Sequence, residues 1–386
     1  MSVEWFDLGL RLAARERGGP VERLRHAPVA PGAARVWVAA SEGASGVQVR
    51  AAVPGGPVGR ADGGECLDLL GALGVSIAAP EPVTLVVEDE STLPALVALA
   101  RASDPASSRG VVAAHVGWWA ERSDFPSGRA VLDVVQACRS RWVLGLAPSA
   151  ERSLSVWAQG VEDERAPLML AELVSAGSPL PLLAVLVEDE LASWEYAQTA
   201  HAEGRDWRHP DGTGRAALGL RSRCDAADVY AAALLSDPLY RERAVHTGHV
   251  VIGRVVEASG RRIGVECARL DARLRPGSQV HGWVGGVAGG SLTFGGEVLA
   301  ASVNGGRLVL SVAVVGALPG HGDAVTLHDA PPNVGGQVSG RSRYRWHYAA
   351  RRSWLTTGRA PVAARREVPL SVLVAGASDD GQEDQR

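Results

Sequence analysis

The densest set of side chains that could bind a ligand lies near the carboxyl end of the chain, in residues 341–366. This stretch contains eight arginines and no acidic residue. Guanidinium groups donate paired hydrogen bonds to phosphate oxygens and also stack on flat rings. Aromatic side chains alternate with the arginines and offer surfaces on which unpaired bases stack. The candidate nucleic-acid-binding residues are Arg341, Arg343, Tyr344, Arg345, Trp346, Arg351, Arg352, Trp354 and Arg359.

Charge is unevenly distributed along the 386-residue chain. The whole chain has a net charge of −4, but the residues outside 341–366 carry 31 arginines against 43 aspartates and glutamates. The stretch therefore predicts contact with a polyanion, and its aromatic rings favour single-stranded nucleic acid or RNA, whose base faces are free. The alternative is that the arginines dock on the acidic remainder of the chain or on a protein partner, with Trp346 and Trp354 as anchors.

The chain contains no lysine, so its 39 basic residues are all arginines. Such a composition is typical of codon bias in a GC-rich genome, but the chemical consequence holds whatever the cause. A phosphate-binding loop of the Walker A type, a Schiff-base enzyme and a protein kinase each need a lysine. The chain also lacks the GxSxG and HExxH motifs and a GxGxxG that follows a strand. The sequence thus assigns no catalytic residue and no cofactor, and favours a binding protein over an enzyme.

Two acidic clusters each follow an apolar run. Glu88-Asp89-Glu90 follows residues 84–87, and Glu188-Asp189-Glu190 follows residues 183–187. Carboxylates that converge at strand ends can hold Mg²⁺, which would suit a metal-dependent enzyme acting on nucleotides or phosphodiesters. The structural alternative for the first cluster is a helix start capped by Ser91 or Thr92. For the second cluster, the alternative is the solvent-facing side of one helix over residues 183–202.

Histidines could supply a general base if a carboxylate orients the ring. His115 precedes two tryptophans, and His209 lies in the segment Trp207-Arg208-His209-Pro210-Asp211. His246 and His249 are close enough in sequence to share a ligand, but they lie at a strand entrance. Most histidines, however, lie on the surface or are buried in the core with their hydrogen bonds made, and this is the structural alternative for each of the four.

The cysteine pattern and the apolar runs indicate a cytoplasmic protein. The four cysteines are far apart, with no CxxC pair, so the sequence predicts free thiols and no zinc site. The first residues do not form a secretory signal. The longest apolar run, residues 180–187, is too short to span a bilayer. The cysteines are Cys66, Cys138, Cys224 and Cys267.

Residues 1–245 have the alternating patterns of a helix-rich α/β or α+β region. The expected strands are residues 35–39, 46–53, 84–87 and 110–114. The expected helices are residues 5–17, 66–73, 93–101, 129–141, 166–176, 183–202 and 225–235. Residues 212–219 are rich in glycine and are expected to form a turn that leads into a helix.

Residues 246–330 change to period-2 alternation with glycine-rich turns, which indicates a small all-β barrel. Two segments of this region, 249–283 and 294–328, repeat the same features at an offset of 43 to 45 residues. Each has a turn, at Ser259-Gly260 or Asn304-Gly305, and later a Pro-Gly pair. The barrel is therefore either OB-like, as a plain five-stranded barrel, or a pseudo-symmetric six-stranded one.

The start of this region is similar over a short stretch to the first strand of an S1-type RNA-binding domain, in residues 249–257. The aromatic residues expected on an S1 binding face are missing from the first three strands, so the likeness identifies no family. Residues 331–386 are expected to form a basic arm and a polar tail. The sequence favours a nucleic-acid-binding accessory protein, with a metal-dependent enzyme or a scaffold subunit, in which Trp118-Trp119 and Trp346 anchor an interface, as the alternatives.

Overall fold

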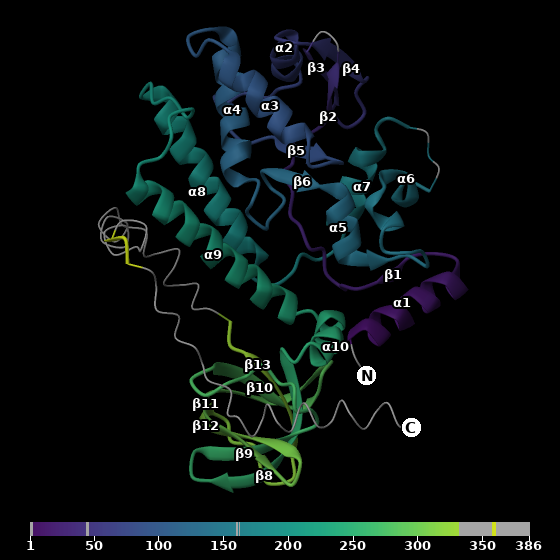
Figure 1. Cartoon of the computed structure of the whole chain (residues 1–386), viewed down its shortest axis with the longest axis vertical. Coiled ribbons are helices and arrows are strands. Elements are labelled where there is room, and N and C mark those ends of the chain that lie inside the picture. The colour runs from purple at the N-terminus through teal and green to yellow at the C-terminus, as the bar shows by residue number, and fades with distance from the viewer. Residues whose placement is uncertain (1–2, 44–45, 160, 162, 332–356, 360–386) are drawn as a thin grey trace. The chain divides into compact units, whose positions relative to one another are not determined.

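A computed structural model describes residues 3–43, 46–159, 161, 163–331 and 357–359. The chain divides into two compact units. The first, called the α/β unit, is formed by Ala14–Ala231. The second, called the sheet unit, joins Ala232–Pro332 to the first residues of the chain, up to Ala13. The protein is thus a mixed α/β molecule with several sheets (Figure 1).

The α/β unit is built on a five-stranded sheet in the order β4-β3-β2-β5-β6. The strands β2, β5 and β6 are parallel, whereas β3 and β4 join β2 as antiparallel neighbours. A separate antiparallel pair is formed by β1 and β7. The strands are β1 (Val21–Glu22), β2 (Arg35–Gly43), β3 (Gly46–Ala52), β4 (Gly59–Asp62), β5 (Thr84–Val87), β6 (Val131–Asp133) and β7 (Trp142–Val143).

Both faces of this sheet are covered by helices, because successive side chains of a strand point to opposite faces. Val36 and Val38 of β2 lie in one core with α2, α3 and α4, and Trp37 and Ala39 lie in another with α5 and α7 (Figure 1). All four residues of β5 are buried, as expected for a strand covered on both sides. The sheet is therefore the middle layer of three.

Most helices lie where the sequence predicts them. Helix α8 has the same bounds as the helix predicted over residues 183–202. The helices in the described part of the chain are α1 (Val3–Arg17), α2 (Glu65–Ala72), α3 (Thr92–Ala102), α4 (Ser108–Arg122), α5 (Val134–Arg141), α6 (Leu154–Trp157), α7 (Ala166–Ser175), α8 (Leu183–Ala202), α9 (Thr213–Leu235) and α10 (Pro238–His246), with a short 3₁₀ turn at Ala150–Arg152.

Three local predictions were wrong. Residues 110–114 form no strand but lie inside α4, a helix that is buried on nearly all sides and therefore shows no amphipathic period. Residues 131–133, expected to be helical, form the short strand β6 before α5 begins. The glycine-rich segment 212–219 was expected to be a turn before a helix, but α9 already begins at Thr213 and includes all of the segment except Gly212.

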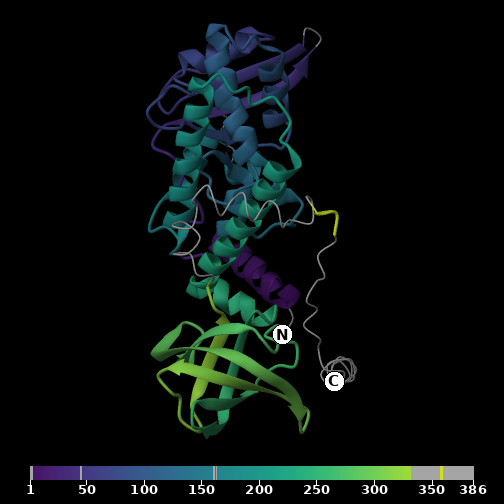
Figure 2. The same ribbon diagram turned by 90° about the vertical axis from the view of Figure 1, so that its left-hand side faces the viewer.

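The sheet unit contains six antiparallel strands in the order β10-β11-β12-β9-β8-β13, and β10 also pairs with β13, so that every strand has two neighbours (Figure 2). The plain five-stranded alternative is therefore wrong. Apolar side chains from all six strands form one core. The strands are β8 (Val250–Ser259), β9 (Arg262–Cys267), β10 (Gln279–Gly286), β11 (Gly289–Asn304), β12 (Arg307–Gly316) and β13 (Ala324–Asp329).

The two predicted turns join the two long hairpins of this sheet. Gly260 and Gly305 adopt φ angles of 58° and 57°, the left-handed conformation that glycine tolerates best. Both hairpins also contain a one-residue bulge on their first strand, beyond Val255 in β8 and beyond Val298 in β11. Equivalent turns and bulges thus recur in the two halves of the sheet.

Among the described residues, no helix is both long enough and apolar enough to cross a membrane. The four cysteines are free thiols; Cys224 is exposed and the other three are buried.

Candidate functional site

The predicted arginine-aromatic residues lie almost entirely outside the described part of the chain. This applies to Arg341, Arg343, Tyr344, Arg345, Trp346, Arg351, Arg352 and Trp354. Arg359 is described and is exposed, and its backbone N–H donates to the hydroxyl of Thr357 at 3.4 Å. The role of this stretch therefore stays a prediction.

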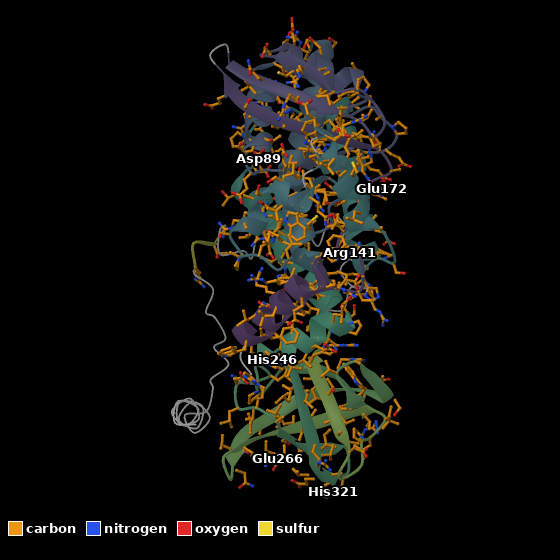
Figure 3. All side chains as sticks on the ribbon, turned by 90° about the vertical axis from the view of Figure 1, so that its right-hand side faces the viewer. Asp89, Arg141, Glu172, His246, Glu266 and His321 are labelled. Atoms are coloured by element: carbon orange, nitrogen blue, oxygen red, sulfur yellow. The ribbon has the colours of Figure 1, made fainter. Side chains whose placement is uncertain are left out.

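The first acidic cluster begins a helix. Asp89, labelled in Figure 3, follows β5. Its carboxylate accepts hydrogen bonds from the backbone N–H groups of Ser91 and Thr92 at 2.7 and 2.9 Å and from both hydroxyls at 2.6 and 3.1 Å. Burial acts to raise the pKa of Asp89, but these hydrogen bonds outweigh it and hold the pKa below its ordinary value. Ser91, one of the two predicted residues, is the N-cap residue of α3, but its side chain makes no capping hydrogen bond. The carboxylate of Asp89 binds the backbone N–H groups of Ser91 and Thr92 at the start of this helix.

The second acidic cluster lies within one continuous helix, as its structural alternative predicted, but two of its acids do not face solvent. Asp189 and Glu190 of α8 are 6% and 1% exposed. Arg122 of α4 donates to Asp189 at 3.0 Å, and its Nε lies 3.9 Å from Glu190. The guanidinium also lies 3.4 Å from the centre of the Phe125 ring. Burial lowers the pKa of Arg122 to about 10 and raises the pKa of Glu190.

These contacts give Asp89 and Asp189 partners within the chain. Within the ranges that the structure describes, no three histidine, cysteine, aspartate or glutamate side chains gather in a group that could hold a metal ion. The acidic clusters therefore add no positive geometric support to the metal-dependent alternative.

His115 is a core residue. Its ring is fully buried beside Trp118, Trp119 and Trp194, and its Nε2 lies 3.3 Å from the carbonyl oxygen of Val83. Burial lowers the pKa of His115 to about 4. Trp118 and Trp119 are 1% and 0% exposed, so the suggestion that they anchor an interface was wrong.

We expect His115 to make the α/β unit sensitive to acid. Because the folded pKa is below the unfolded value, the unfolded state binds the proton more tightly, and stability is lost as pH falls below about 6.5. Between pH 7 and pH 5 this loss amounts to about 2 kcal/mol. His115→Gln keeps a hydrogen-bond donor but does not titrate, so urea unfolding at the two pH values should show that much less pH dependence in the variant. An unchanged pH dependence would contradict the assignment.

The other candidate histidines, His209, His246 and His249, each have different neighbours among the described residues. His209 is exposed, and the carboxylate of Asp206, 3.8 Å away, already binds Arg208 at 2.8 Å. His246 lies against the ring of Phe6. His249 instead lies 3.1 Å from the guanidinium of Arg273.

A groove in the α/β unit brings together arginines and aromatic rings that are far apart in sequence. It consists of two adjoining cavities of about 340 and 280 Å³. Both are lined by Trp207 and Arg205, from the segment between α8 and α9, and by His201 of α8. We call it the Trp207 groove.

Contacts of the Trp207 ring, and of the neighbouring residue Arg208, hold this segment in place. The Trp207 ring packs against Gly117 of α4, where a Cβ atom would come within 2.4 Å of the indole. The next residue, Arg208, donates to the carbonyl oxygens of Ser103 and Arg101 at 2.7 and 3.3 Å. Arg208 also binds both carboxylate oxygens of Asp206 and lowers the pKa of that carboxyl to about 2.

Tyr196 of α8 forms the other aromatic wall of the groove. The guanidinium groups of Arg205 and Arg215 lie 4.9 and 5.3 Å from the centre of its ring. Arg205 also donates to the Tyr196 hydroxyl at 2.7 Å. Flat cationic and aromatic surfaces are therefore gathered in one place, an arrangement that can stack against a planar ligand.

Comparison with protein-family models, curated proteins and solved structures finds no match for this chain. The Trp207 groove has to be interpreted from its own chemistry.

Sequence reasoning missed this groove, although it noted the segment from Trp207 to Asp211. The available signal was the recurrence of arginine and aromatic residues over positions 196–215. That signal did not reveal Gly117, which lies 90 positions before Trp207 and makes room for its ring.

Proposed function

We propose that the protein is a cytoplasmic nucleic-acid-binding accessory protein that binds single strands or RNA. One observation carries the proposal: eight arginines and no acid occur in residues 341–366, interleaved with aromatic residues, in a chain that is otherwise acidic. In this role Arg341, Arg343, Arg345, Arg351 and Arg352 bind phosphates, while Trp346 and Trp354 stack on bases.

The Trp207 groove supports the same proposal. Its larger cavity is lined by Arg101, Arg205 and Arg215 and also by three carboxylates, so its lining is close to neutral. Such a groove suits uncharged bases better than phosphates. The arginine-rich stretch then supplies most of the attraction to the sugar-phosphate backbone, which depends on net positive charge.

The proposed architecture of the sheet unit is a pseudo-symmetric barrel with two related halves, 249–283 and 294–328. The equivalent turns and bulges of its two long hairpins support this interpretation. A closed set of pairings removes exposed sheet edges. The residues beyond 330 extend from this unit in sequence as the basic arm and tail.

A scaffold role is the second candidate, because α1 carries exposed apolar side chains at helical spacing. Trp5, Leu8 and Leu12 are 65%, 43% and 52% exposed. Spacing of three and four residues places side chains on one face of a helix. Such a face is suited to packing against a protein partner.

Purification of the full-length chain without nuclease separates the two candidates. We expect a 260/280 nm absorbance ratio above that of pure protein, a fall in this ratio after nuclease treatment, and bound RNA or single-stranded DNA that can be sequenced. A stoichiometric protein partner that survives nuclease, together with an absorbance ratio of pure protein, would favour the scaffold role and contradict the proposal.

A further inference from the structure

We infer that the Trp207 groove is a nucleobase-binding site, in which Trp207 is the wall shared by two base-sized cavities. The inference deepens the proposed function and rests on it. The ligand chemistry is that of a flat, uncharged ring with hydrogen-bonding edges. A strand of nucleic acid and a free nucleotide both supply it, and we assign the strand as the source.

The walls of the groove are preorganised for a flat ligand. Trp207 is held against Gly117, and the neighbouring Arg208 is bonded to the end of α3. Because these contacts within the chain hold both groups in place, binding of a base costs little additional ordering. The Tyr196 ring, with Arg205 and Arg215 over it, is the second flat wall.

The charges in the groove favour bases over phosphates. Glu121, Asp206 and Asp211 line the larger cavity together with its arginines. Carboxylates repel phosphate oxygens but accept hydrogen bonds from the amino groups of bases, and arginine donates to base oxygens and ring nitrogens. A base has both kinds of edge, so it matches a lining that carries both donors and acceptors.

The volumes fit more than one base. Cavities of about 340 and 280 Å³ that share Trp207, Arg205 and His201 form one continuous site. Ligand sites in proteins commonly measure about 300–1,000 Å³, and the continuous site formed by the two cavities reaches this range. We place one base on each side of Trp207, with the connecting sugar-phosphate outside the lining.

The test compares two labelled single strands of equal length, one with bases and one abasic, in fluorescence-polarisation titrations of the full-length protein. Stacking contributes about five- to 150-fold in affinity per base, so the wild type should prefer the base-bearing strand by at least fivefold. Gly117→Ala should reduce this preference, because the new Cβ would lie within 2.4 Å of the Trp207 ring.

The matched control is Gly219→Ala in α9, where the nearest atom to the new Cβ is the Arg223 guanidinium at 3.8 Å. This variant should keep the wild-type preference. If Gly117→Ala fails to fold, Tyr196→Ala replaces it, since that side chain is 45% exposed and its removal leaves the core intact. Circular dichroism confirms folding in each case.

A base preference that survives both Gly117→Ala and Tyr196→Ala would overturn the groove assignment and leave the proposed function standing, because stacking on Trp346 and Trp354 would account for it. Equal binding of the two strands by the wild type would overturn the groove assignment and also the stacking role of Trp346 and Trp354, but not the phosphate-binding role of the arginines. No binding of either strand would overturn the proposed function. Saturation by adenosine or cytidine monophosphate, with Gly117→Ala abolishing it and no strand bound, would support base recognition but overturn the strand as its source.

Discussion

Replacing Arg122 with methionine is expected to lower the free energy of unfolding by about 3–5 kcal/mol, the usual cost of breaking a buried ion pair from one side. The guanidinium is 5% exposed and is bonded to Asp189, which is itself almost fully buried. Glu190, 1% exposed, is the other nearby carboxylate. Methionine would remove the guanidinium that pairs with Asp189 and lies 3.9 Å from Glu190, and both carboxylates would stay in the core. Urea unfolding followed by circular dichroism measures the change.

The control is the triple variant Arg122→Met, Asp189→Leu, Glu190→Leu, which removes the three charges together. It should recover a large part of the lost stability, because apolar replacement of a whole buried ionic group is often neutral or stabilising. The loss of stability in Arg122→Met should also be smaller at lower pH, because burial already raises the pKa of Glu190 and a protonated Glu190 no longer needs a cation. A loss below about 1 kcal/mol in the single variant would show that the pair contributes no more than an exposed one.

Replacing the five proposed phosphate-binding arginines with glutamine is expected to weaken binding of single-stranded RNA by at least about a hundredfold at 50 mM salt. Each lost phosphate contact leaves counterions bound to the RNA that would otherwise be released, so the losses of affinity multiply. The substitutions are at Arg341, Arg343, Arg345, Arg351 and Arg352. Fluorescence polarisation with a labelled strand of mixed sequence measures the dissociation constant.

A charge-matched variant controls for the general loss of positive charge. It carries five Arg→Gln substitutions at exposed positions elsewhere, namely Arg60, Arg221, Arg261, Arg262 and Arg307. Its net charge equals that of the first variant, yet its affinity should fall far less. Equal losses in the two variants would mean that overall charge, and not the arginine-rich stretch, attracts the RNA.

Local patterns predicted much of the fold where one side of an element is buried. The helix over 183–202 has Leu183, Leu186 and Trp194 in the core and exposed residues between them, so its period was visible. The strand β5 has four buried residues and sits between clear breaks. The failure at residues 110–114 has the opposite cause: α4 is buried all round, and a uniformly apolar run does not distinguish a strand from a helix.

The candidate site was harder to predict, because tertiary contacts create it. Gly117 and Trp207 meet only when α4 packs beside the segment that follows α8. The burial of Asp189 and Glu190 was equally hidden, since acidic side chains in a helix are usually exposed and here the approach of Arg122 from α4 helps to stabilise their burial. Sequence patterns report periodicity along one element, whereas these features depend on a partner element elsewhere in the chain.

The most direct test of the central claim is the salt dependence of RNA binding by the wild-type, full-length protein. Five phosphate contacts to a single strand predict a slope of about −3.5 for the logarithm of the association constant against that of salt concentration. Affinity should therefore fall about a hundredfold between 50 and 200 mM salt. A flat response over this range would contradict the claim that the arginine-rich stretch binds a polyanion.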